Sequence, residues 1–259
     1  MCQNRFIQHC HVVAKEFDMK KKIVLIALVA VVVLALSVVL AGCDLFAFIE
    51  GQNNEELRDF YVSASGDKFV ISGLKNSSIT DVVIPERVVS IGAEAFKNTR
   101  VSSVSMAEGV VNIGHRAFEN CSSLTSITLP STLVTIESEA FKGCNMLPSI
   151  TLGENVTYIR DCAFENCSSL TEVVIPSKVT RIENGTFKGC INLISVTLPA
   201  GVEYVGSDVF YLCQNLRTIN FGGTMAQWNA MVRMDNWKES VANFDVVCLD
   251  GVIEAYMVV

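Results

Sequence analysis

The chain has 259 residues, of which 50% are hydrophobic and 18% charged, and its formal net charge is −7 at pH 7. A chain of this length usually forms one or two domains. This chain also contains an internal repeat, described below, and the number of repeats then sets the size of the folded part. An acidic balance argues against nucleic acid and against an anionic membrane face as partners, because both attract basic surfaces.

The N-terminal segment has the order of charge and hydrophobicity that is typical of an export signal. Lysines occupy positions 20–22, and the apolar stretch of residues 23–41 follows at once. As a helix this stretch would span roughly 28 Å, so an uncleaved transmembrane helix is the alternative interpretation. Residues 1–18 fit no signal peptide, and we therefore expect the natural start at Met19.

The apolar stretch ends in Leu40-Ala41-Gly42-Cys43, which resembles the lipobox of bacterial lipoproteins. The resemblance implies that a peptidase cuts before Cys43 after its sulfur has been diacylated. Two or three acyl chains attach a protein stably, whereas one chain is marginal. We therefore expect residues 1–42 to be removed and the protein to be extracytoplasmic, anchored to a membrane through the lipid on Cys43. That removal leaves 15 basic and 25 acidic side chains, a net charge of −10.

Two further segments precede the repeats. Residues 43–58 are expected to be a tether, because much of the segment is polar. Residues 59–78 are expected to be a capping hairpin, in which residues 60–62 and 69–71 are strands joined across residues 65–67. A hairpin here would cover the open edge of the first repeat, as the ends of stacked arrays require.

Residues 79–222 repeat one phrase, and a phenylalanine marks most of its copies. The separations between these phenylalanines are 22 and then 23 four times running. A fixed period of this length predicts a solenoid, in which each coil buries its apolar side by stacking on its neighbours. We therefore expect a β-rich solenoid of repeats of about 23 residues. The marker residues are Phe96, Phe118, Phe141, Phe164, Phe187 and Phe210.

Each repeat contains two short apolar patterns and a turn. Residues 124–130 read Leu-Thr-Ser-Ile-Thr-Leu-Pro, and the alternation over the last part of this phrase predicts a strand that the proline ends. A second apolar pair, Leu133 with Ile136, predicts another short strand. Phe141 follows in a tight turn. The repeat is too short for a crossover helix.

A longer period of 46 residues indicates two alternating coil types, because the eight residues from Phe118 recur from Phe164. Coils stack about 4.8 Å apart, so a column of alternating charge gives each residue opposite neighbours. Each exposed pair contributes only about 0–1 kcal/mol, and we expect the alternation mainly to specify register. The column consists of Lys97, Glu119, Lys142, Glu165 and Lys188.

The phrase Leu-x-x-Ile-x-Leu-Pro, followed by residues 136–144 (Ile-Glu-Ser-Glu-Ala-Phe-Lys-Gly-Cys), resembles the leucine-rich repeats of bacterial BspA-like surface proteins. The resemblance covers residues 79–222. Residues 223–259, which include Trp228 and Trp237, are similar to the C-terminal cap of such proteins. The resemblance to BspA-like proteins implies a right-handed leucine-rich-repeat coil array, anchoring to the cell envelope, and a role in protein binding or adhesion. Architecture transfers through such a resemblance better than a ligand does.

Five cysteines lie 23 residues apart, one in each repeat. In stacked coils their Cα atoms would lie about 5 Å apart, inside the disulfide range, although parallel side chains suit the required torsion poorly. Buried cysteine also serves as a small apolar filler, and we favour that interpretation over disulfides or a metal site. The column consists of Cys121, Cys144, Cys167, Cys190 and Cys213.

Catalysis finds little support in the sequence. His115 is the only histidine of residues 43–259, so a Ser-His or Cys-His arrangement would depend on it alone. Carboxylates such as Glu137, Asp161 and Glu183 are scattered at turn positions, as on a solvated face. No glycine-rich phosphate loop is present. The sequence therefore predicts no enzyme, no metal site and no cofactor.

The remaining candidate is the strand face that lies between the buried leucines. Solenoids bind along such faces, although Ser and Thr also suit any solvated strand. We expect a monomer that binds an unidentified protein or envelope ligand, and the alternative role is a spacer or scaffold in the envelope. The candidate binding face comprises Ser126, Thr128, Ser149, Thr151, Glu172, Ser195, Thr197, Thr218 and Asn220.

Overall fold

The computed structural model describes residues 55–241 and 243–254. The described residues belong to a single compact unit, Phe46–Val259. The export signal, Cys43 and most of the expected tether lie outside the described residues. Among the residues described, no helix combines the length and the apolar character needed to cross a membrane.

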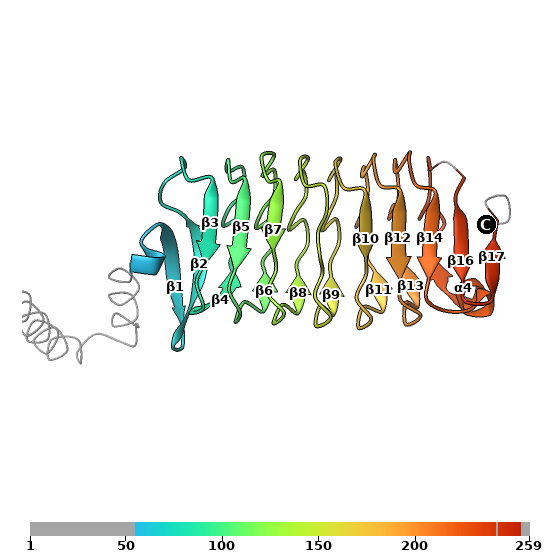
Figure 1. Ribbon diagram of the computed structural model, residues 1–259, viewed down its shortest axis with the longest axis horizontal. Helices are drawn as coiled ribbons and strands as arrows, with labels where there is room; N and C mark the ends of the chain where they lie inside the picture. Colours follow the sequence, from blue (N-terminus) through green and yellow to red (C-terminus); the bar gives the residue numbers. More distant parts are fainter. Residues whose placement is uncertain (1–54, 242, 255–259) are drawn as a thin grey trace, which may run out of the picture. The chain divides into compact units, whose positions relative to one another are not determined.

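Successive coils lie side by side, and most of them give a first and a second strand to parallel ladders (Figure 1). The first strands form one three-stranded and one five-stranded sheet. The smaller sheet contains β3 (Asp81–Ile84), β5 (Ser103–Met106) and β7 (Ser126–Thr128). The larger contains β10 (Glu172–Val174), β12 (Ser195–Leu198), β14 (Thr218–Phe221), β16 (Asp245–Cys248) and β17 (Gly251–Ile253).

The second strands form two further sheets, and from β6 onward each of them has only two residues. One sheet has the order β1 (Phe60–Ser65), β2 (Lys68–Leu74), β4 (Val88–Ile91), β6 (Asn112–Ile113), β8 (Thr135–Ile136) and β9 (Tyr158–Ile159). The other has the order β11 (Arg181–Ile182), β13 (Tyr204–Val205) and β15 (Val232–Arg233). Pairs between coils are parallel, and only the end pairs β1–β2 and β16–β17 are antiparallel among the described strands. The predicted β-solenoid with its spacing of about 23 residues is confirmed.

The six marker phenylalanines form a single row of stacked rings through the core. Neighbouring ring centroids lie 5.0 to 5.9 Å apart, and the ring planes differ by no more than 7°. All six side chains are at most 1% exposed. Each ring therefore helps to exclude water from its neighbours within the apolar core.

Aromatic side chains close both ends of this row. Phe60 of β1 meets Phe96 edge-on at 6.3 Å, and Trp237 meets Phe210 edge-on at 6.1 Å. Trp228, in helix α4 (Met225–Ala230), lies 6.1 Å from Trp237 and is 2% exposed. The short helix η1 (Glu55–Leu57) ends in a fully buried leucine.

The first-strand ladder is divided where Pro148 stands. The backbone N–H of Thr125 donates to the coil before it at 2.9 Å, and that of Thr171 does so at 3.2 Å. Pro148 occupies the equivalent position but has no N–H to donate. Residues 149–152, which follow Pro148 directly, form no strand. The first-strand ladder therefore stops at β7 and resumes at β10.

The two alternating coil types have a packing reason. Two residues after each marker phenylalanine the backbone is left-handed, and from Phe118 to Phe187 this position alternates between Asn and Gly, whereas Leu212 occupies it after Phe210. The Oδ1 atom of Asn120 lies 2.5 Å from where a Cβ atom on Gly143 would be, and Asn166 lies equally over Gly189. Gly143 and Gly189 therefore leave room for the amide of the preceding coil, and the 46-residue unit follows from this pairing.

Gly143→Ala is expected to lower the free energy of unfolding by more than about 1 kcal/mol, because a Cβ atom meets both a left-handed backbone and the Asn120 amide. Urea unfolding followed by circular dichroism measures the change. Gly153→Ala is the matched control, since the nearest atoms lie 3.7 Å from its Cβ position. Equal losses in the two variants would contradict the packing explanation.

Candidate functional site

The outward positions of the first strands bring the predicted binding residues onto one surface, which we call the first-strand face. Register pairs Glu172 with Ser195 and Ser195 with Thr218, while Thr197 pairs with Asn220. The side chains between them, such as Val196, point inward and are buried. The predicted residues that are exposed are Ser126, Thr128, Ser149, Thr151 and Glu172. Those that are half-buried are Ser195, Thr197, Thr218 and Asn220.

The first-strand face also contains residues that the sequence analysis left out. Asp81 pairs in register with Ser103, and Asp245 pairs with Thr218, so carboxylates stand at both ends of the hydroxyl column. Val83 is 70% exposed in the neighbouring column, as is Val174 at 62%, which the sequence pattern had already placed on this face. Aligning the degenerate first and last repeats with the central ones would have placed Asp81, Val83 and Asp245 on the face.

Neighbouring hydroxyl groups donate hydrogen bonds to the carboxylate of Asp81. Ser103 Oγ donates to Asp81 Oδ1 at 2.5 Å, and Thr80 Oγ1 donates to Asp81 Oδ2 at 3.1 Å. The hydrogen bond from Ser103 is the main cause that lowers the pKa of Asp81. The face is therefore polar and acidic, and its hydroxyls can both donate and accept hydrogen bonds.

The predicted charge column is present, but its residues pair two by two. Lys97 Nζ lies 3.0 Å from Glu119 Oε2, and Lys142 Nζ lies 2.8 Å from Glu165 Oε2. Lys188 pairs instead with Asp208 at 3.0 Å, which is a correction to the simple alternation.

A second set of charges, two residues before the phenylalanines of the first three marked coils, was missed as a row: Glu94, Arg116 and Glu139. Arg116 binds both carboxylate oxygens of Glu139, at 3.0 and 3.1 Å, and contacts Glu119 at 3.6 Å. The hydrogen bond from Arg116 lowers the pKa of Glu139. The stabilisation from this group is therefore present above its ordinary pKa of 4.5 and is lost as the pH falls through the lowered value.

The cysteine column supplies hydrogen bonds as well as volume. Each thiol donates to the backbone carbonyl of the phenylalanine in the coil before it, for example Cys144 to Phe118 at 3.2 Å and Cys121 to Phe96 at 3.0 Å. All described cysteines are free, and the five of the column are buried. Burial raises the pKa of Cys167 to about 12, so the thiol keeps the proton that it donates. These contacts support the filler interpretation.

The residues considered for catalysis do not come together. His115 is exposed, and its Nδ1 lies 3.0 Å from the carbonyl oxygen of Ser138 in the next coil, where it serves as a donor. Asp161 accepts from the backbone and side chain of Asn184, and Glu183 pairs with Arg181 at 3.1 Å. Within residues 55–241 and 243–254, no three His, Cys, Asp or Glu side chains gather as a metal site would require.

Comparison with known proteins places this geometry in a family. Residues 71–193 and 111–232 match the BspA type leucine-rich repeat region, in six copies. The chain belongs to the BspA-type leucine-rich repeat family. The resemblance stated from the sequence is thereby confirmed for the repeats. No curated protein matches the chain.

Solved leucine-rich repeat structures share the fold. A Treponema pallidum leucine-rich repeat protein is 30% identical with a TM-score of 0.60, covering 64% of this chain and 84% of that one. A leucine-rich cell surface protein of Faecalibacterium prausnitzii is 25% identical with a TM-score of 0.54, and the match covers 63% of this chain and 53% of that one. The pneumococcal vaccine antigen PcpA, at 16% identity and a TM-score of 0.50, shows the fold alone.

Reversal of the paired carboxylates is expected to destabilise the repeats. Glu119→Lys or Glu165→Lys replaces an ion pair by a like-charge contact with Lys97 or Lys142. The cost is about 1 kcal/mol each, a fall in melting temperature of about 2–4 °C that shrinks at high salt. Calorimetry measures it, and Glu203→Lys at an exposed position is the control. Unchanged melting temperatures would show that the column does not stabilise the array.

Proposed function

We propose that this leucine-rich repeat protein binds a protein or envelope ligand on its first-strand face and performs no chemistry of its own. The observation that supports the proposal is that all nine residues expected from the sequence lie at the outward positions of the first-strand segments, five of them exposed and four half-buried. The strand ladder beneath this face stops at β7 and resumes at β10, but successive coils still present their outward residues side by side, so a partner can contact several repeats at once.

The chemistry of the face indicates the kind of partner. Its outward columns carry Asp81, Glu172 and Asp245 and no lysine or arginine. Residues 43–259 have a net charge of −10 as well. A partner rich in basic groups and hydrogen-bond donors is complementary to this surface, whereas an acidic one is repelled. The exposed Val83 and Val174 add apolar contact.

The same proposal includes an anchor outside the described residues. The segment Leu40-Ala41-Gly42-Cys43 supports cleavage and lipidation at Cys43. The Faecalibacterium prausnitzii relative carries the description of a cell surface protein, in agreement with an extracytoplasmic position for this chain. In this arrangement the lipid retains the protein at the envelope while the first-strand face remains accessible to ligands.

Substituting Thr128, Thr151 and Thr197 together by lysine is expected to abolish capture of the partner. Three long cationic side chains would repel a basic partner and project from a surface that is otherwise short and polar. The measurement is a pull-down from envelope extract with the purified protein, with the captured partner identified by mass spectrometry. Capture by the unsubstituted protein should also weaken between low and physiological salt.

The matched control adds the same charge elsewhere. Thr180, Ala226 and Asn229 are exposed residues outside the first strands, and their replacement by lysine should leave capture unchanged. Equal capture by both triple variants would exclude the first-strand face. The absence of a captured partner from every preparation would favour the spacer or scaffold role.

The anchor is tested by the intact mass of the protein extracted from membranes. We expect a chain that begins at Cys43 and carries two or three acyl chains. Cys43→Ser should leave an unlipidated precursor that retains residues 23–41. A natural protein that keeps these residues and has no acyl chains would support the uncleaved transmembrane helix instead.

A further inference from the structure

The N-terminal edge of the first-strand ladder is open. β3 begins its sheet, in the order β3-β5-β7, and no described strand pairs with its other side. The hairpin β1–β2 extends the second-strand sheet instead. An edge strand presents backbone N–H and C=O groups without partners, which a further strand can satisfy.

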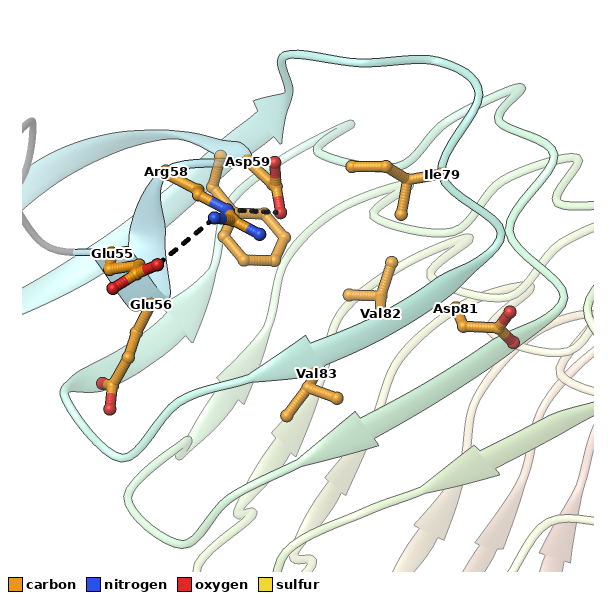
Figure 2. A pocket seen from close by; sticks show the side chains of 9 residues that line it. Glu55, Glu56, Arg58, Asp59, Ile79, Asp81, Val82 and Val83 are labelled. Atoms are coloured by element: carbon orange, nitrogen blue, oxygen red, sulfur yellow. Dashed lines mark hydrogen bonds and ion pairs between the residues drawn. The ribbon is translucent and has the colours of Figure 1, made fainter.

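Two hollows flank this edge. One, of about 430 Å³, lies between η1 and β3, with Glu55, Glu56 and Arg58 on one side and Asp81, Val82 and Val83 on the other (Figure 2). The other hollow, of about 500 Å³, continues past Ile84 to Pro85 and shares Glu56 and Val83 with the first.

Apolar surface at the edge matches what a docked strand would cover. Val83 is 70% exposed, the highest value among the described valines, and Val82 beside it points toward the core. Ile79, which also lines the first hollow, packs against the core but is only partly buried. A strand placed along β3 would therefore meet apolar side chains on both of its faces.

A segment of the chain that precedes the described residues has the composition that such an edge would accept. Residues 45–49 read Leu-Phe-Ala-Phe-Ile, five apolar residues in succession, and residues 50–54 read Glu-Gly-Gln-Asn-Asn, a composition typical of turns. We propose that residues 45–49 pair with the open edge of β3 and fill the hollows beside Val83. The proposal is independent of lipidation at Cys43 and of the ligand of the first-strand face.

The connection is long enough for either strand direction. Five residues, 50–54, reach up to about 17 Å, whereas the four residues of β3 span about 13 Å. The chain enters the described structure at Glu55, which itself lines the first hollow. A short linker of this kind gives the tethered segment an effective concentration of about millimolar, so it outcompetes a free peptide of equal affinity.

Hydrogen exchange of the full chain in detergent micelles tests the pairing. In Phe46→Asp/Phe48→Asp, the amides of residues 81–84 are expected to exchange at least tenfold faster, while those of β17 exchange as before. Gln52→Asp/Asn54→Asp adds the same charge in the linker and should leave β3 protected. Equal exchange of residues 81–84 in both double variants would overturn the proposal.

Limited chymotrypsin digestion tests the same contact from the other side. Cleavage after Phe46 and Phe48 should be slow in the natural sequence and at least tenfold faster in Val83→Asp. Val174→Asp, at a similarly exposed valine of an inner coil, should not change the rate. Protection that disappears on dilution would assign the edge to a second copy, and protection that requires added lipid vesicles would assign residues 45–49 to the membrane. Either result would overturn the proposal.

Discussion

The stacking of one coil on the next is the interaction on which this molecule depends. The row of phenylalanines supplies its apolar part, since centroids 5.0 to 5.9 Å apart leave no room for water between rings. Backbone ladders supply the polar part, and the cysteine thiols add a hydrogen bond from each coil to the one before it. No coil could keep its core dry alone, which is why both ends carry aromatic covers.

The sequence predicted what repeats at a fixed spacing. Phe141 and Cys144 recur every 23 residues because each occupies one column, and an identical environment accepts an identical side chain. The outward direction of Thr128 and Thr151 followed from the same period, since inward and outward positions alternate along a strand. Family membership, fold and the orientation of the candidate face could therefore be predicted from the order of the amino acids alone.

Features that depend on contacts between columns could not be predicted in this way. The bidentate pair of Arg116 with Glu139 joins residues 23 apart, but only the structure shows that their row lies beside that of Lys97 and Glu119. The thiol hydrogen bonds depend on the direction of backbone carbonyls, which no spacing reveals. Pro148 was visible in the sequence. Its effect could not be predicted, because only the structure shows that the backbone N–H at this position of other coils donates to the preceding coil.

Asn120 packs over Gly143, and oppositely charged residues pair beside this contact. Because both contacts join unlike coils, they restrict how the number of repeats can change. Loss of a single coil would bring Glu119 against Glu165, or Lys142 against Lys188. Loss of two adjacent coils from the central part of the array keeps residues of opposite charge next to one another. Duplications and deletions in units of 46 residues are therefore the ones that selection should tolerate, and the length of the array would change in double steps.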